Sequence, residues 1–149
     1  VNIGTWSTTP VPWDTTGLPS GNYTLVAYVR AAGNASIIET SVYGAAMIGN
    51  VCYSTNSVTG SPASPQALST TIALTATATC IGSATPEFLY YYSLNGGAAT
   101  QLGTWSAGPV SWNTTGLPPG NFTLLVLTRA VGDGSAESSL YGSFQLTTM

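Results

Sequence analysis

The sequence contains no histidine and no lysine, and its only cationic side chains are Arg30 and Arg129. Without histidine, the usual Ser/His/Asp and Cys/His catalytic arrangements cannot form, and zinc or copper would lack its commonest ligand. The net charge of −3 leaves no basic patch for nucleic acid or anionic lipid. We therefore expect a protein that is not an enzyme, needs no cofactor and binds no nucleic acid.

Acidic residues are also few, and the sequence scatters them: Asp14, Glu39, Glu87, Asp133 and Glu137. None belongs to the alternating Asp/Asn loop of a calcium site. A glycosidase would use two of them as a carboxylate pair, but a second copy of the surrounding sequence has Asn113 where the first has Asp14. A turn residue is the simpler interpretation of that position.

Long apolar runs are absent, so we expect no membrane insertion. Val1 opens the sequence without a methionine or a signal peptide, which we interpret as a mature form or an excerpt. Only 5% of the residues are charged, whereas 44% are hydrophobic, enough for a β core. This composition favours an extracellular or cell-surface protein.

A long sequence repeat organises what is present. WDTTGLPSGNYTLVAYVRAAG, residues 13–33, returns as WNTTGLPPGNFTLLVLTRAVG, residues 112–132, at an offset of 99 residues. That spacing is close to the length of one sandwich-type domain and exceeds solenoid repeats. We expect residues 1–50 to be the C-terminal half of a repeat, with its last four strands, and residues 51–149 to be a complete repeat.

Alternating side chains and many turn residues predict an all-β fold. The strands expected in the first half are residues 2–7, 11–13, 23–31 and 36–48. The second half has the matching four, preceded by 51–59, 70–80 and 87–94, which makes seven, the count of an immunoglobulin-like β-sandwich. The alternation assigns ten side chains to the interior: Tyr23, Leu25, Ala27, Ile72, Leu74, Phe88, Tyr90, Phe122, Leu124 and Val126.

Each copy of the repeat reads as strand, tight turn, strand. Pro119 and Gly120 fit the centre of a type II turn, and Ser20 and Gly21 fit the equivalent place. The tryptophans seven residues apart suit cross-strand pairs in hairpins, namely Trp6 with Trp13 and Trp105 with Trp112. Core packing is the simpler interpretation of these rings, and a sugar-binding platform would require two of them exposed side by side.

The motif W-[DN]-T-T-G-L-P-x-G-[NQ]-[YF] occurs twice, and TATATC and ATPEFLYYY precede its second copy. Together they resemble Ig-like or fibronectin-type repeat modules of large secreted bacterial and archaeal surface proteins. The resemblance covers nearly the whole chain and implies a structural module without shared chemistry. Such modules usually carry charged residues between the aromatic residues of the third strand, where this sequence has Leu89 and Tyr91.

Cys52 and Cys80 are the two cysteines, and their midpoint falls inside the turn-rich segment SPASPQ. An antiparallel hairpin around that turn places them opposite one another. In an extracellular chain we expect a disulfide rather than two buried thiols.

Four asparagines begin N-x-S/T sequons and are candidate N-glycosylation sites: Asn22, Asn34, Asn113 and Asn121. A role in capping turns is the alternative interpretation.

Apolar side chains also occupy the outward parity of the strands, where a solvated sandwich would have polar groups: Val26, Tyr28, Leu89, Tyr91, Leu125 and Leu127. We interpret them as assembly contacts of a structural protein that builds a filament, pilus-like fibre or surface layer from copies of itself or adjacent repeats. The alternative is an adhesin or carbohydrate-binding module that binds glycans. The half-repeat needs completion, either by earlier strands of a longer tandem array, which we favour, or by a neighbouring chain.

Overall fold

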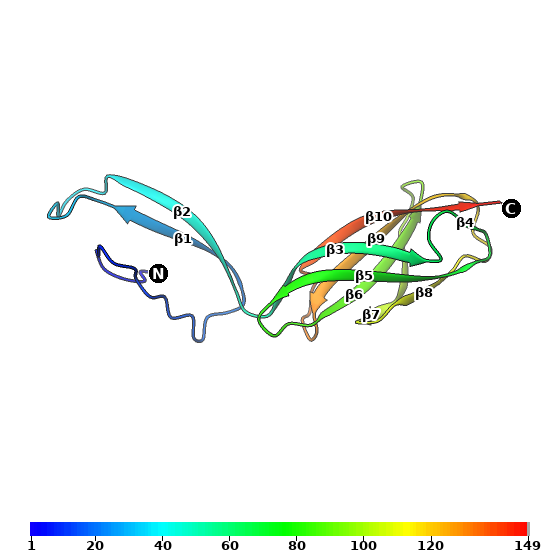
Figure 1. Ribbon diagram of the computed structural model, residues 1–149, viewed down its shortest axis with the longest axis horizontal. Helices are drawn as coiled ribbons and strands as arrows, with labels where there is room; N and C mark the ends of the chain where they lie inside the picture. Colours follow the sequence, from blue (N-terminus) through cyan, green and yellow to red (C-terminus); the bar gives the residue numbers. More distant parts are fainter. Residues whose placement is uncertain (149) are drawn as a thin grey trace. The chain divides into compact units, whose positions relative to one another are not determined.

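The computed structural model describes residues 1–148, and all its regular elements are β-strands (Figure 1). The chain divides into two compact units, unit 1 (Val1–Gly49) and unit 2 (from Asn50 onward). In residues 1–148 no helix is long and apolar enough to cross a membrane. The all-β prediction is confirmed.

Unit 2 contains two sheets. The five-stranded sheet has the order β4-β10-β9-β6-β7, and the three-stranded sheet has the order β3-β5-β8. All neighbours are antiparallel except β4 and β10, which pair in parallel. The strands are β3 Val51–Ser61, β4 Gln66–Ala67, β5 Thr71–Ile81, β6 Pro86–Leu94, β7 Thr100–Ser106, β8 Val110–Asn113, β9 Gly120–Ala130 and β10 Ser138–Thr147.

Side-chain alternation creates the core between these two sheets. Every second residue of β9 is buried, and the seven side chains of unit 2 that the sequence assigned to the interior are all buried. Trp112 of β8 lies at the centre, with its ring 5.4 Å from Phe122 and 5.6 Å from Phe144. The cluster consists of Ile72, Leu74, Ala76, Phe88, Tyr90, Trp112, Phe122, Leu124, Val126, Phe144 and Leu146.

The tight turn of the repeated motif lies earlier than the sequence predicted. The backbone N–H of Leu117 donates to the carbonyl of Thr114 at 3.1 Å, and Gly116 between them has a φ of 81°. Gly120, by contrast, is already the first residue of β9. The prediction of a turn centred on Pro119 and Gly120 is therefore wrong, because the turn forms at Thr114–Leu117, where Gly116 takes the left-handed conformation.

The predicted tryptophan hairpins are also wrong. Trp105 belongs to β7 in the five-stranded sheet, whereas Trp112 belongs to β8 in the three-stranded sheet, so the chain crosses between the layers. Trp6 and Trp13 lie in a segment, residues 1–20, that contains no strand. The seven-residue spacing marks a crossover, which sequence alternation alone cannot distinguish from a hairpin.

Unit 1 has one two-stranded sheet, formed by β1 (Gly21–Val29) and β2 (Thr40–Ile48) (Figure 1). The strands expected at residues 2–7 and 11–13 are not formed. In unit 2 the corresponding strands, β7 and β8, pair with β6 and β5. Unit 1 contains no counterpart of β5 or β6 with which these segments could pair.

Candidate functional site

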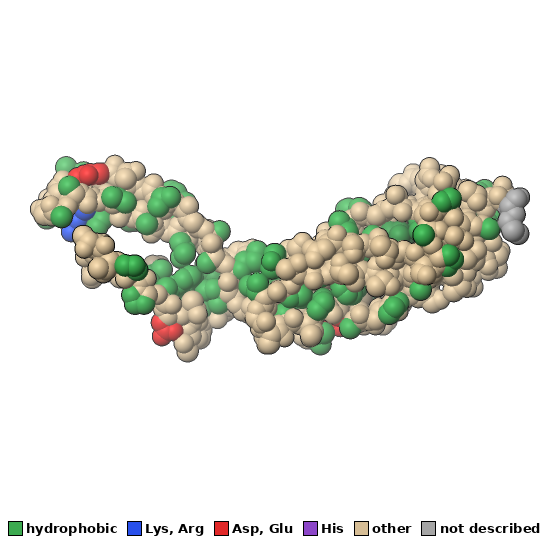
Figure 2. Space-filling model, viewed as in Figure 1, with side chains coloured by type: hydrophobic (Ala, Val, Ile, Leu, Met, Phe, Trp, Pro, Cys, Tyr) green, Lys and Arg blue, Asp and Glu red, His purple; other side chains and the backbone are tan. Residues whose placement is uncertain are grey.

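The most distinctive surface is the side of unit 1 that corresponds to the core side of unit 2. We call it the open face and define it by Trp13, Tyr23, Leu25, Ala27 and Gly44. Tyr23, Leu25 and Trp13 are half-buried and Ala27 is exposed, although their counterparts in unit 2 are all buried. In Figure 2 hydrophobic side chains of unit 1 are visible at the surface. The sequence expectation of a buried Ala27 is not met, because no second sheet in residues 1–49 covers this side.

The open face keeps the aromatic geometry of a finished core. The rings of Trp13 and Tyr23 lie 5.7 Å apart at 70°, and those of Trp112 and Phe122 lie 5.4 Å apart at 69°. Both are edge-to-face contacts, the arrangement that aromatic quadrupoles favour. One half of a core is thus already arranged in unit 1.

A notch in the same face points to what would fill it. In unit 2, Leu124 pairs with Gly142, and a Cβ on Gly142 would lie 2.5 Å from a methyl group of Val58 on β3. In unit 1, Leu25 pairs with Gly44, but a Cβ there would meet nothing within 4 Å. Glycine at this position therefore leaves room for a β3 side chain in unit 2 and an empty notch in unit 1.

Two arginines stack on tryptophans in the same way. Arg30 Cζ lies 4.0 Å from the centroid of the Trp6 ring, and Arg129 Cζ lies 4.2 Å from that of Trp105. Such cation–π contacts also shield the apolar stem of the arginine. The difference is that Arg129 Nε additionally donates to Glu87 of β6 at 2.6 Å, the only ion pair within residues 1–148.

One glutamate directly precedes the last strand of each unit, Glu39 before β2 and Glu137 before β10. The N–H of Glu39 donates to the carbonyl of Val29 at 2.9 Å, and that of Glu137 donates to Thr128 at 2.8 Å. The Glu137 carboxylate also accepts hydrogen bonds from two backbone N–H groups, Cys52 at 2.6 Å and Ala130 at 3.0 Å. It thereby ties the start of β3 to the end of β9.

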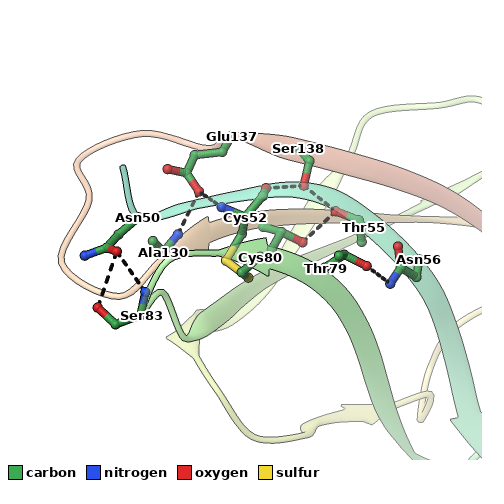
Figure 3. The surroundings of a disulfide bond; sticks show 11 residues. Asn50, Cys52, Thr55, Asn56, Thr79, Cys80, Ser83, Ala130, Glu137 and Ser138 are labelled. Carbon is green, nitrogen blue, oxygen red and sulfur yellow. Dashed lines mark hydrogen bonds between the residues drawn. A yellow bond between two sulfur atoms is a disulfide. The ribbon is translucent and has the colours of Figure 1, made fainter. Parts of the chain in front are cut away.

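The expected disulfide between Cys52 and Cys80 is present in the structure, where it links β3 and β5 (Figure 3). It joins neighbouring strands of one sheet rather than the two layers. Around it, Ser138 Oγ donates to the carbonyl of Cys52 at 2.9 Å, and the hydroxyls of Thr55 and Thr128 are 2.6 Å apart (Figure 3). The bond and these contacts fasten the end of unit 2 that holds Glu137.

The predicted assembly residues differ in their exposure. Val26 and Tyr28 are exposed, whereas Tyr91, Leu125 and Leu127 are half-buried. Leu89 has only 7% of its surface exposed, and the β6–β7 register shifts between the pairs on either side of it, Phe88–Ser106 and Tyr90–Leu102. Leu89 therefore contributes packing rather than open surface.

Two tyrosines that the sequence analysis missed dominate the same outward side. Tyr43 pairs with Val26 and Tyr141 pairs with Leu125, and each tyrosine is 69% exposed. The register of β2 and β10 against the repeated strands could have identified them. Apolar and aromatic side chains recur at matching outward positions of both units.

The sequons occupy turns and strand starts. Asn22, Asn113 and Asn121 are exposed, and Asn34 is half-buried. Asn113 Oδ1 accepts from the N–H of Thr115 at 3.0 Å, so this side chain caps the turn. The exposed side chains of Asn22 and Asn121 are accessible to a glycan.

The carboxylates do not assemble into a site. Asp14 Oδ1 accepts from the N–H of Thr16 at 2.9 Å, as Asn113 Oδ1 accepts from the N–H of Thr115. Hydrogen bonds from the side chain and the backbone of Thr16 lower the pKa of Asp14. Within residues 1–148 no three His, Cys, Asp or Glu residues cluster as metal ligands do. Asp14 thus has the turn role that the sequence favoured.

Comparison with known proteins found no matching family model, no matching curated protein and no matching solved structure.

Proposed function

We propose that the chain is part of an extracellular structural protein, a segment of a filament, pilus-like fibre or surface layer built from tandem Ig-like β-sandwich units. The observation that carries the proposal is the open face of unit 1. It has the aromatic pair and the glycine notch of a sandwich half, but no second sheet in residues 1–49. The stacked arginine, which directly follows β1 on the opposite parity, also matches unit 2. A half-sandwich of this kind gains stability only by joining further strands.

The topology of unit 2 supports the Ig-like part of the proposal. One sheet has the order β4-β10-β9-β6-β7 and the other the order β3-β5-β8, and two packed sheets of mostly antiparallel strands are the architecture of immunoglobulin-like sandwiches. The 99-residue spacing of the motif supports the tandem arrangement. The proposed location outside the cytoplasm is supported by the Cys52–Cys80 disulfide.

The outward side supports contacts between units. Tyr43 and Tyr141 project from equivalent strands, each next to an apolar neighbour on the repeated strand. Exposed aromatic residues flanked by apolar ones are enriched at protein interfaces. The proposed partners are therefore other copies of the chain or adjacent repeats.

An adhesin or carbohydrate-binding module is the second candidate, but the tryptophans favour it less. Trp112 is fully buried and Trp105 is stacked on Arg129, so these two rings of unit 2 do not form a side-by-side platform.

Electron microscopy of the native material tests the proposal. Antibodies raised against unit 2 should label regular fibres or a layer at the cell surface. Labelled protein found only as dispersed monomers would reject a structural role.

A further inference from the structure

The polar groups of unit 2 that bond to β3 and β6 have counterparts in unit 1 that lack such partners. Arg129 pairs with Glu87 of β6, whereas within unit 1 Arg30 Nη1 donates to the nearby carbonyl of Ala35 at 3.1 Å. The Glu137 carboxylate accepts from the Cys52 N–H of β3, whereas within unit 1 the Glu39 carboxylate accepts from Asn34 Nδ2 at 3.4 Å. Unit 1 thus has the arginine and the glutamate at equivalent positions, but it has no strands like β6 and β3 to supply their partners.

We propose that the open face of unit 1 is covered by a segment of the same polypeptide that has the strand order of β3–β6 and joins residue 1 through a turn like residues 95–99. This inference rests on the proposed tandem structure and specifies the chemistry of the covering segment. Its β6-like strand carries an acidic residue opposite Arg30. Its β3-like strand offers a backbone N–H to the Glu39 carboxylate and a side chain of valine size to the notch at Gly44.

One departure between the units refines this chemistry. Thr128 has a buried hydroxyl that bonds to Thr55 of β3. Its counterpart in unit 1 is Val29, which offers no hydroxyl. Thr55 Oγ1 also lies 3.0 Å from Ser138 Oγ, so a hydroxyl opposite Val29 would lose one of the two partners that it has in unit 2. An apolar residue of the covering strand therefore fits better opposite Val29.

Two observations identify the same polypeptide as the source. A second copy of this chain has one β3–β6 segment, and that segment is already engaged in unit 2 through the disulfide, the Glu87–Arg129 ion pair and the core. In addition, β6 pairs antiparallel with β7 and reaches it through residues 95–99. Since residue 1 corresponds to Thr100, a β6-like strand pairing with residues 1–7 would end next to residue 1.

The test fuses a copy of residues 50–99 directly ahead of Val1, which reproduces the segment order of unit 2. Amide hydrogen exchange in β1 and β2 is then compared between the fusion and the unfused 149-residue chain. We expect exchange at Leu25 and Gly44 to slow by at least about 100-fold in the fusion, because these strands become part of a cooperatively folded core. Equal exchange in the two proteins would overturn the proposal.

Matched glycine variants show whether the notch is filled. Gly142→Ala should destabilise unit 2 in both proteins, since its Cβ would meet Val58. Gly44→Ala should speed the exchange of β1 about tenfold or more in the fusion and leave the unfused chain unchanged. An equal effect of Gly44→Ala in both proteins would contradict a filled notch.

Thr55→Val can be made either in the added copy or in the original unit 2, which gives a second pair of matched variants. Thr55→Val in the added copy should slow the exchange of β1 further, because it would face Val29. The same substitution in the original unit 2 should lower its stability, because Thr128 loses a hydroxyl partner. Faster exchange of β1 with the valine copy would refute the predicted apolar partner.

Sedimentation of the unfused chain distinguishes the source. We expect a monomer whose β1 and β2 exchange rapidly, whereas a dimer with protected β1 would assign the covering segment to a second copy and overturn the proposal. These solution measurements do not depend on fibres. Dispersed native protein would thus reject the structural role alone, and rapid exchange in the fusion would reject this inference alone.

Discussion

The carboxylate of Glu137 holds the first strand of unit 2 by accepting the backbone N–H of Cys52, 85 positions away in the chain, at 2.6 Å. The same oxygen accepts the N–H of Ala130 at 3.0 Å. One side chain directly before β10 thus joins β3 of one sheet to β9 of the other. Its counterpart Glu39 has no such role within unit 1.

Glu137→Ala should lower the unfolding free energy of unit 2 by about 2–4 kcal/mol, because two partly buried N–H groups lose a charged acceptor. Urea unfolding followed by circular dichroism measures the loss. Glu39→Ala is the matched control and should change the unfolding of unit 2 by less than about 0.5 kcal/mol. Equal losses from both substitutions would contradict the assigned role.

Removing the disulfide should destabilise unit 2 strongly. The double variant Cys52→Ala with Cys80→Ala should cost about 3–4 kcal/mol, since the bond closes a loop of sequence separation 28. Thermal unfolding of the variant and of the oxidised parent measures the difference. An unchanged midpoint would show that strand pairing alone fixes β3 against β5.

The hydroxyl of Tyr90 is buried in the core of unit 2 without a hydrogen bond to the described residues, so phenylalanine should be tolerated at this position. Tyr90 is almost fully buried, its Oη has no hydrogen-bond partner in residues 1–148, and burial raises the pKa of this phenol above its ordinary value of 10.0. Tyr90→Phe should leave the stability at pH 7 unchanged or raise it by about 1 kcal/mol.

The same residue gives unit 2 a pH dependence of known sign. A phenol whose pKa is raised by folding binds its proton more tightly in the folded state, so its contribution is constant below pH 10 and is lost as the pH rises above 10. Urea unfolding at pH 8 and at pH 11 should therefore show a smaller alkaline loss in Tyr90→Phe than in the parent. An identical loss in both proteins would assign the effect elsewhere.

Two substitutions on the outward side distinguish a residue that contacts other copies of the chain from a residue that packs within unit 2. Tyr141→Ser should change stability by less than about 0.5 kcal/mol, because this residue is exposed, yet it should reduce association of the native protein. Trp105→Ala should destabilise unit 2 by about 1–2 kcal/mol, since the Trp105 ring stacks on the guanidinium of Arg129. Light scattering and thermal unfolding measure the two effects. Normal association of Tyr141→Ser would exclude this side as an interface.

Local rules were sufficient for much of unit 2. The alternation along β9 predicted that Phe122, Leu124 and Val126 face inward, because a strand with one buried face has period two. The positions of Cys52 and Cys80 around a turn predicted their bond. Both inferences depend on neighbours within one strand or one hairpin.

What the sequence analysis missed depends on contacts between distant segments. The spacing of Trp105 and Trp112 fits a hairpin, but the two rings belong to different sheets, and only tertiary structure reveals the crossover. Leu89 is buried although its parity is outward, and the role of Glu137 depends on the backbone N–H of Cys52 on another strand. Side-chain type alone does not encode these partners.

Hydroxyl-radical footprinting of the native surface material tests most directly whether the open face of unit 1 is covered. We predict that Trp13 and Tyr23 are oxidised as slowly as Trp112 and Phe122 in that material. In the isolated 149-residue chain the first two should react much faster than the second two, because the open face is then uncovered. If Trp13 and Tyr23 react as fast in the native material as in the isolated chain, no segment covers the open face and the account is wrong.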